Sequence, residues 1–164
     1  MKQASLYRRD GLKNIEAFSD ADYAQDVQTR HSTSGAVCKF ADGAVTWLSQ
    51  KQKCVALSTT ETDIIAANEA AKVAVWLKRL FDVLISTDIP VLKCENMSSV
   101  KLAKNPEYHK SSKHVRYFWI RERYISGDLN VEHVDGEVQV ADILTKPLAK
   151  PRFQRLRAFL GLVE

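Results

Sequence analysis

The sequence is poor in cysteine, glycine and proline, and it lacks any long hydrophobic run. Its three cysteines, Cys38, Cys54 and Cys94, are far apart and form no C-x-x-C pair, which argues against a disulfide framework or a zinc site. We expect them to be small buried side chains in a reducing compartment. No apolar stretch approaches bilayer length, and the first residues lack the apolar core of a signal peptide. These absences predict a soluble, intracellular protein.

The remaining composition is that of a single globular domain. With 164 residues, of which 45% are hydrophobic and 27% charged, the chain can bury one sizeable core but is too short for two ordinary domains. A formal net charge of +4 favours a polyanionic partner only weakly. We interpret residues 1–14, which are polar and basic, as a residual connection to an upstream segment, and residues 15–164 as the domain.

A short apolar run that ends in acids is the central feature of the sequence. The stretch IEAFSDADY, residues 15–23, predicts a buried central strand with Asp20 at its exit. A carboxylate there needs water or a metal ion to offset its desolvation. The alternative is that Asp20 and Asp22 only begin a turn, because aspartate readily bonds its own backbone.

A hairpin and a long helix are predicted next. Two short apolar runs flank Ala41-Asp42-Gly43, a strong hairpin signal, and CVALS at 54–58 is a candidate third run beside them. Ser58-Thr59-Thr60-Glu61 fits a capping box, so a helix should begin there and end near Leu84. Its apolar residues recur at helical spacing.

The second half of the chain alternates strands and helices. VLKCEN predicts a short buried strand, MSSVKLAKN a helix, LNVEHV a last strand, and DGEVQVADILTK a turn and a helix start. A basic, aromatic segment at 107–128 should be partly helical, and PLAKPRFQRLRAFLGL should form a short amphipathic helix with a basic face. Antiparallel strands followed by βα crossovers predict an α/β fold with a mixed sheet.

Four acids stand at the edges of predicted elements, and they can meet at one crevice although they are far apart in the sequence. They are Asp20, Asp63, Glu95 and Asp142. Carboxylates gathered in this way need cations, and Mg²⁺ is the natural choice for oxygen ligands. Two such ions about 4 Å apart support in-line phosphoryl chemistry. We find no Ser-His-Asp elbow, phosphate loop or dinucleotide fingerprint.

A family resemblance adds to this interpretation. The succession FSDADYA, STSGAV, WLSQKQKCVALSTTETDIIAANEAAKVAVWLKRL, CENMSSVKLAKNP, YFWIRE and QVADILTKPL resembles the ribonuclease H domain of copia-type retrotransposon Pol polyproteins. The resemblance runs from about Phe18 to Leu162. It implies the ribonuclease H-like fold, a five-stranded mixed sheet whose second strand is antiparallel to the others, with helices on both faces.

The resemblance also implies an activity and a site. The family cleaves the RNA strand of RNA/DNA hybrids with four acids and two Mg²⁺ ions, for which Mn²⁺ can substitute. Carried over, Asp20 would bridge both metals and Asp142 would help to hold the ion that activates water.

Two of the four positions depart from the family pattern. Asp63, in TETDIIA, stands where the family has glutamate, and Glu95, in CENMSS, stands where it has aspartate. Each carboxylate is therefore displaced by about 1.5 Å relative to the pattern. The paired swap either compensates or marks a copy that has lost activity. The segment SSKHVRYFWIRE is also two residues shorter than its counterpart in the family.

Several residues are candidates for contact with nucleic acid. Ser19 and Asn96 flank two of the acids, and Lys113 and Arg116 belong to the basic aromatic segment. The alternative for that segment is a solvated basic helix face with Phe118 and Trp119 in the core. We assign Trp47 and Trp76 to the core as well. Four histidines show no metal-ligand spacing and receive no role: His31, His109, His114 and His133.

The sequence therefore predicts a ribonuclease H endonuclease that works beside an upstream reverse transcriptase during retrotransposition. Its expected partners are the RNA/DNA hybrid and that polymerase, without a membrane. Its expected location is the cytoplasmic particle of the element or the nucleus. The alternatives are a catalytically impaired module that binds nucleic acid or supports the polymerase, and an exapted interaction domain.

Overall fold

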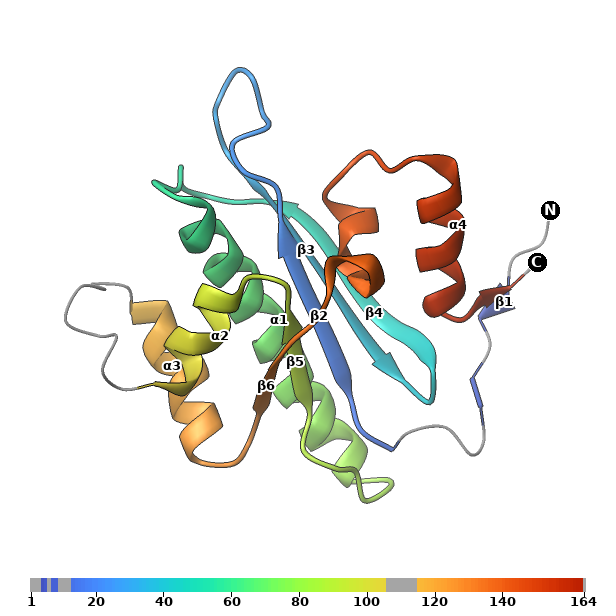
Figure 1. The fold of residues 1–164 in the computed structure, drawn as a ribbon. Helices are drawn as coiled ribbons and strands as arrows, with labels where there is room; N and C mark the ends of the chain where they lie inside the picture. The colour runs from blue at the N-terminus through green and yellow to red at the C-terminus, as the bar shows by residue number, and fades with distance from the viewer. Residues whose placement is uncertain (1–3, 6, 9–12, 106–114, 164) are drawn as a thin grey trace.

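The computed structural model describes residues 4–5, 7–8, 13–105 and 115–163, and in this part of the chain the fold is built on one five-stranded sheet. The strands lie in the order β4-β3-β2-β5-β6 (Figure 1). Their bounds are β2 (Glu16–Ala21), β3 (Thr33–Phe40), β4 (Gly43–Lys51), β5 (Val91–Cys94) and β6 (Asn130–His133).

Strand β2, which carries Asp20, is the central strand, as predicted. It pairs antiparallel with β3 and parallel with β5, while β3 pairs antiparallel with β4 and β5 pairs parallel with β6. Strand β3, the second of the five in chain order, therefore runs antiparallel to the other four. This confirms the mixed sheet expected from the resemblance.

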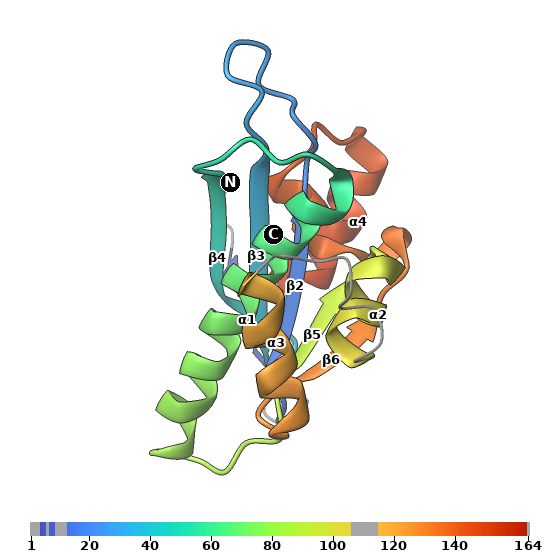
Figure 2. The same cartoon turned by 90° about the vertical axis from the view of Figure 1, so that its left-hand side faces the viewer.

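Helices cover both faces of the sheet. Helices α1 (Thr59–Asp82), α2 (Met97–Lys104) and α3 (Val115–Ile125) lie on one face. The 3₁₀ turns η2 (Gly136–Val138) and η3 (Val140–Leu144) follow β6 and lead to α4 (Lys150–Phe159). Figures 1 and 2 show that η3 and α4 cover the opposite face from α1.

Alanines seat α1 closely against the sheet. Ala67, Ala70, Ala71 and Ala74 are at most 3% exposed and share one core cluster with side chains of β2, β3 and β5. The Ser58 hydroxyl accepts from Glu61 N, and the Glu61 carboxylate accepts from Leu57 N, so the predicted capping box starts α1. The first turn of α1 is thus fixed beside the carboxyl end of β2.

The predicted hairpin is present, with a turn one residue earlier than the Asp-Gly pair suggests. Ala41 and Asp42 form the two-residue loop and both have positive φ, 50° and 65°, while Gly43 already belongs to β4. Two left-handed residues in succession are the backbone of a type I′ turn, whose twist matches that of the strands it joins.

Three expectations about exposure and local structure are wrong. CVALS forms no strand: it is the loop into α1, and Cys54 is exposed whereas Cys38 and Cys94 are buried. Trp76 is 59% exposed because it lies on the outer side of α1, and Trp47 is 68% exposed because β4 is an edge strand. Periodicity marks which face of α1 is buried, but residue size led us to place the tryptophans inside.

The two ends of the described chain meet in a short ladder. Strands β1 (Ala4–Ser5) and β7 (Leu162–Val163) pair antiparallel, and the Tyr7 hydroxyl donates to the Ala44 carbonyl at 2.7 Å. The boundary that we placed between residues 14 and 15 stays a prediction. Among the helices of the described residues, none has the length and apolar character needed to cross a bilayer.

Candidate metal centre

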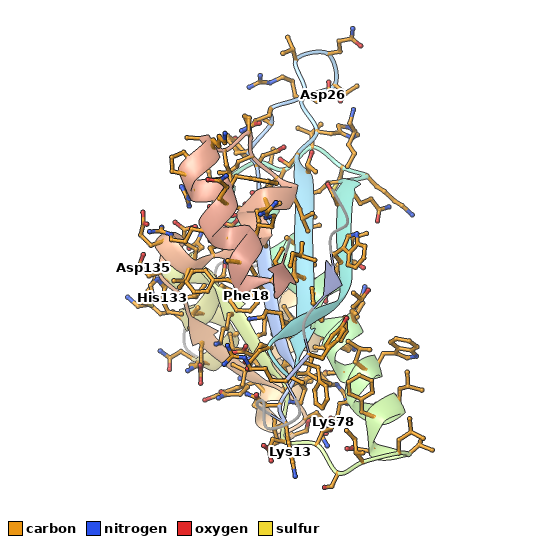
Figure 3. The ribbon with its side chains drawn as sticks, turned by 90° about the vertical axis from the view of Figure 1, so that its right-hand side faces the viewer. Lys13, Phe18, Asp26, Lys78, His133 and Asp135 are labelled. Carbon is orange, nitrogen blue, oxygen red and sulfur yellow. The ribbon has the colours of Figure 1, made fainter. Side chains whose placement is uncertain are left out.

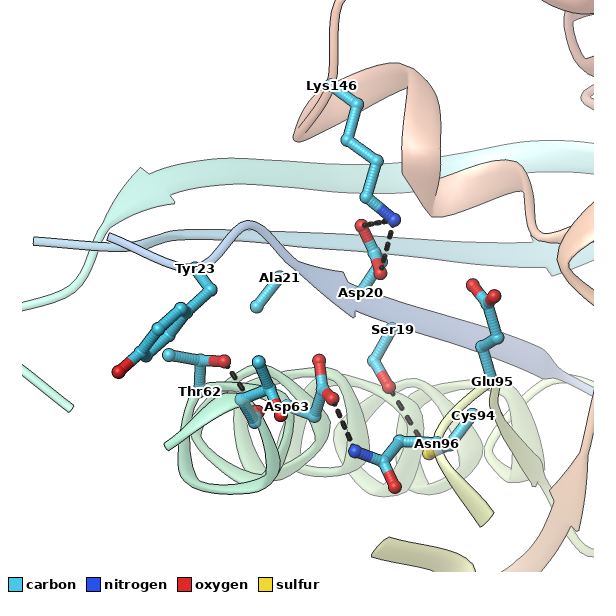
Figure 4. Close-up of a pocket in the computed structure, with 11 residues that line it drawn as sticks. Ser19, Asp20, Ala21, Tyr23, Thr62, Asp63, Cys94, Glu95, Asn96 and Lys146 are labelled. Atoms are coloured by element: carbon cyan, nitrogen blue, oxygen red, sulfur yellow. Dashed lines mark hydrogen bonds and ion pairs between the residues drawn. The ribbon is translucent and has the colours of Figure 1, made fainter. Parts of the chain in front are cut away.

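A polar cavity of about 310 Å³ opens at the carboxyl end of the central strands. The ends of β2 and β5, the first turns of α1 and the segment after η3 form its wall (Figure 4). Parallel strands deliver their following residues to the same sheet edge, which is why residues distant in sequence meet here. Three of the predicted acids line this cavity: Asp20, Asp63 and Glu95.

Asp20, Glu95 and Asp142 come together. Each offers a carboxylate oxygen, and these oxygens all lie within 4.8 Å of one another. Asp20 and Asp142 are buried, at 6% and 1% exposure, whereas Glu95 is exposed. Among the residues that the structure describes, this is the one such group of acidic, histidine or cysteine side chains.

Asp20 is a buried carboxylate with two donors. The Thr145 hydroxyl donates to its Oδ2, and Lys146 Nζ lies 3.1 Å from its Oδ1. Burial raises the pKa of Asp20 to about 6, with nearby Asp142 adding to the shift, while Thr145 and Lys146 oppose it. The alternative, in which Asp20 and Asp22 only begin a turn, does not describe these contacts, because Asp22 Oδ1 accepts from Thr33 N of the neighbouring strand β3 at 2.8 Å.

Asp142 is held by two cations. Lys146 Nζ donates to its Oδ1 at 2.9 Å, and the Arg152 guanidinium pairs with its Oδ2 and also donates to the Gly136 carbonyl at 3.0 Å. Lys146 therefore bridges Asp20 and Asp142. Burial lowers the pKa of Lys146, but the two carboxylates outweigh that effect and raise it above its ordinary value.

A close approach between η3 and the sheet makes these contacts possible. Gly35 lies opposite Asp20 in the β2–β3 register, and a Cβ there would come within 2.7 Å of Thr145 Cγ2 and 2.9 Å of the Ala141 carbonyl oxygen. The fully buried Gln139 ties the same segment down, because its Nε2 donates to the Ser19 carbonyl at 3.0 Å.

Asp63 lies on the cavity wall but outside the group of three. Its Oδ2 accepts from Asn96 Nδ2 at 2.7 Å, and Figure 4 shows it turned toward that amide. Burial raises the pKa of Asp63, an effect that the Asn96 hydrogen bond opposes. Glu95 instead reaches the loop after β6, where its Oε1 lies 2.8 Å from the position of a Cβ on Gly136. The longer carboxylate joins the cluster, and the shorter one does not.

Two of the four predicted nucleic-acid contacts, Ser19 and Asn96, have polar partners within the protein. Asn96 caps α2 by accepting from Ser98 N at 2.9 Å, besides donating to Asp63. Ser19 is 5% exposed, with its Oγ 3.3 Å from Cys94 Sγ. Lys113 and the side chain of Arg116 lie outside the described residues, as do His109 and His114. Those assignments stay predictions.

Sequence reasoning missed the residues that hold the acids in place, which are Gln139, Thr145, Lys146 and Arg152. The available signal was the spacing of Asp142 and Lys146, four residues apart, which places them on one face of a helix. All but Arg152 lie in the QVADILTKPL motif. Their contact with Asp20 depends on how η3 packs on the sheet.

The residues present fit a divalent cation. Three carboxylate oxygens within 4.8 Å form an oxygen-only donor set, which Mg²⁺ and Mn²⁺ prefer over softer metals. Two of these acids, Asp20 and Asp142, already attract positive charge within the chain, as Lys146 and Arg152 show. Asp20, Glu95 and Asp142 are therefore the side chains that could hold the ion.

Comparison with known proteins places these features in context. The chain is 39% identical over 151 residues to a retrovirus-related Pol polyprotein from transposon TNT 1-94 of Nicotiana tabacum, which covers 90% of this chain. It is 35% identical over 159 residues to that of transposon RE1 of Arabidopsis thaliana, covering 94% of this chain. The chain spans only 11% of the length of each relative. No protein-family model matches the sequence.

Solved structures support the same assignment through the fold. LC11-RNase H1, isolated from compost by a metagenomic approach, aligns with a TM-score of 0.59 at 14% identity, covering 82% of this chain and 94% of that chain. The N-terminal RNase H domain of a Mycobacterium tuberculosis protein aligns at 0.55 with 12% identity, covering 88% and 96%. The chain is therefore a ribonuclease H-like domain related, over most of its length, to the Pol polyproteins of copia-type retrotransposons.

Proposed function

We propose that the chain is a metal-dependent endoribonuclease that cleaves the RNA strand of RNA/DNA hybrids during retrotransposon reverse transcription. The observation that carries the proposal is the convergence of Asp20, Glu95 and Asp142 at the carboxyl end of the central strands. A solved structure of LC11-RNase H1 in complex with an RNA/DNA hybrid shares this fold, with a TM-score of 0.56 at 15% identity. The proposed partners are the hybrid and an upstream polymerase segment.

The chemistry follows from the donor set. Divalent cations held by Asp20, Glu95 and Asp142 would supply the positive charge that lowers the pKa of water and offsets charge on phosphate oxygens. Thr145, Lys146 and Arg152 orient the two buried carboxylates. Cys94, which also lines the cavity, is unsuited as a nucleophile because burial raises the pKa of its thiol to about 11.

A second function is favoured by one specific observation. Asp63 is held by Asn96 and is not among the acids that converge. If the missing methylene of Asp63 leaves catalysis incomplete, the domain would bind hybrid or support its polymerase without cutting. The exchange Asp63→Glu/Glu95→Asp restores the family pattern and separates the two functions.

The first prediction is that Asp20→Asn abolishes cleavage while the fold is retained. The amide keeps the shape of the carboxylate but not its charge, so we expect the rate on a labelled RNA/DNA hybrid with Mg²⁺ or Mn²⁺ to fall by more than about a hundredfold. Circular dichroism should remain unchanged. Asp26→Asn, which removes a half-buried acid paired with Lys51, is the matched control and should cut like the wild type.

Each other outcome has a definite meaning. Cleavage that persists in Asp20→Asn contradicts the proposal, because it arises elsewhere. A silent wild type beside an active Asp63→Glu/Glu95→Asp variant supports the second function. Silence in both, with hybrid binding by the wild type, supports a binding module.

A further inference from the structure

We propose that Lys146 is an internal counter-ion that occupies the space between Asp20 and Asp142 and must leave it when a divalent cation binds. Its Nζ lies 3.1 Å from Asp20 and 2.9 Å from Asp142, so one ammonium contacts both buried members of the cluster. The inference rests on the metal site of the proposed function and concerns how that site is loaded.

The hydrogen bonds of the two carboxylates carry the argument. Asp20 Oδ2 accepts from Thr145, Asp142 Oδ2 is paired with Arg152, and the remaining oxygen of each acid is engaged by Lys146. All four oxygens therefore have donors from the protein itself. A cation that ligates both acids meets an ammonium already seated between them, and like charges at such a separation repel strongly in a buried site.

Lys146 is also the donor that can withdraw. Its side chain is 33% exposed, whereas Asp20 and Asp142 are 6% and 1% exposed. It follows η3, in the segment that leads to α4, and a flexible four-carbon stem allows its head group to swing into solvent. Figure 4 shows this side chain, which lines the cavity, reaching down to Asp20.

This arrangement has two linked consequences. Without metal, Lys146 stabilises the fold, because it separates two buried like charges. With metal, the same residue lowers affinity, because its displacement opposes binding. Removing the ammonium should therefore weaken the metal-free protein and strengthen metal binding. A purely structural lysine would give only the first effect.

The test compares Mn²⁺ binding to the wild type and to Lys146→Met by titration calorimetry at about 0.15 M salt, where distant charges are screened. We expect Lys146→Met to bind Mn²⁺ about tenfold more tightly. In chelator its melting temperature should be lower than that of the wild type. On addition of Mn²⁺ its melting temperature should rise by more than that of the wild type. Unchanged or weaker Mn²⁺ binding, or no Mn²⁺ binding by either protein, overturns the inference.

A matched control and a second measurement complete the design. Lys78→Met removes another lysine that pairs with an aspartate four residues away, Asp82. Lys78 lies at the opposite end of the molecule from Asp26 (Figure 3). This variant should leave the Mn²⁺ affinity unchanged. Should Lys146→Met fail to fold, the ammonium resonance of Lys146 in the wild type is followed by NMR during Mg²⁺ addition. A resonance that shifts and exchanges faster with water supports displacement, and one that does not change overturns it.

These readouts are independent of cleavage. If the wild type binds Mn²⁺ as described but cuts no hybrid, the displacement of Lys146 stands and the endonuclease activity fails. If hybrid is cut but Lys146→Met binds Mn²⁺ no more tightly, the proposed function stands and the role of Lys146 fails.

Discussion

Asp20 shows at the scale of one residue how a site suited to cations works against the stability of the fold. Its carboxylate is buried beside Asp142, and the Thr145 hydroxyl and Lys146 ammonium only partly offset the loss of water. The pKa therefore rises from 3.8 to about 6. A proton or a cation on Asp20 relieves this cost, whereas ionisation alone increases it.

The pH dependence of unfolding should reveal this cost in the presence of chelator. Between about pH 4 and pH 6 the folded protein holds a proton on Asp20 that the unfolded chain has released, so stability falls as pH rises through this window. The expected loss is on the order of 3 kcal/mol. Urea unfolding of the wild type and Asp20→Asn across this range checks it, since the variant lacks the titrating group.

Asp26 should contribute a pH dependence of stability opposite in sign to that of Asp20. Its ion pair with Lys51 holds its pKa below the ordinary value, so any stability that this acid contributes is present at neutral pH and is lost on acidification. Asp26→Asn should therefore leave the fall between pH 4 and pH 6 intact. Wild-type and Asp20→Asn curves that run parallel through that window would contradict the role of Asp20.

At the scale of elements, the close packing of η3 on β3 aligns the site. Gly35→Ala would place a methyl group 2.9 Å from the Ala141 carbonyl oxygen and 2.7 Å from Thr145 Cγ2, so η3 has to move away from the sheet. We expect destabilisation by about 1–3 kcal/mol, typical of overpacking, together with weaker Mn²⁺ binding. Chemical denaturation and titration calorimetry measure the two effects.

Gly127→Ala is the control for Gly35→Ala, because it strains the backbone without placing a methyl group against any other atom. Gly127 has a φ of 77°, so alanine is strained there, but a Cβ would meet no atom within 4 Å. This variant should lose stability and keep the Mn²⁺ affinity of the wild type. Equal affinity in Gly35→Ala and Gly127→Ala would show that the position of η3 does not control the site.

Periodicity and turn chemistry predicted most of these elements, because they are local properties. The capping box at Ser58, the helical spacing in α1 and the acid after β5 can all be read from adjacent residues. The role of Gly35 cannot, since it depends on a segment more than a hundred residues later in the chain. The contact of Lys146 with Asp20 is equally distant along the chain. The spacing of Lys146 from Asp142 did not reveal it either, because the same spacing is typical of an ordinary surface ion pair.

The candidate site was predicted in composition but not in arrangement. The positions of acids at element edges, together with the resemblance, indicated four acids, and three of them converge. The separation of Asp63 reflects side-chain length and the Asn96 hydrogen bond, which no spacing rule encodes. Trp76 was assigned to the core but is exposed, since large aromatic side chains are not always buried.

At the scale of the whole molecule, metal binding should appear as added stability. A ligand that binds only the folded state stabilises it by about 2.7 kcal/mol at a hundred times its dissociation constant. For a domain of this size that corresponds to a rise in melting temperature of roughly 5–10 °C. Thermal unfolding with increasing Mn²⁺ should show this rise in the wild type.

Two variants define the specificity of that effect. Asp142→Asn should lose most of the Mn²⁺-dependent rise, because it removes the charge of one of the three carboxylates that could hold the ion, a side chain that is only 1% exposed. Asp26→Asn should keep the rise. A similar increase in all three proteins would indicate weak binding elsewhere on the surface.

The ladder of β1 and β7 determines how the molecule responds to a pull on its ends. Ala4 lies opposite Val163 and Ser5 opposite Leu162, so the chain enters and leaves at the same end of an antiparallel pair (Figure 1). Tension applied there opens the ladder one residue pair at a time rather than shearing it. The five-stranded sheet that carries the acids is a separate hydrogen-bonded unit. We therefore expect the ladder to open first when residues 4 and 163 are pulled apart, before force loads the strands that position Asp20 and Glu95.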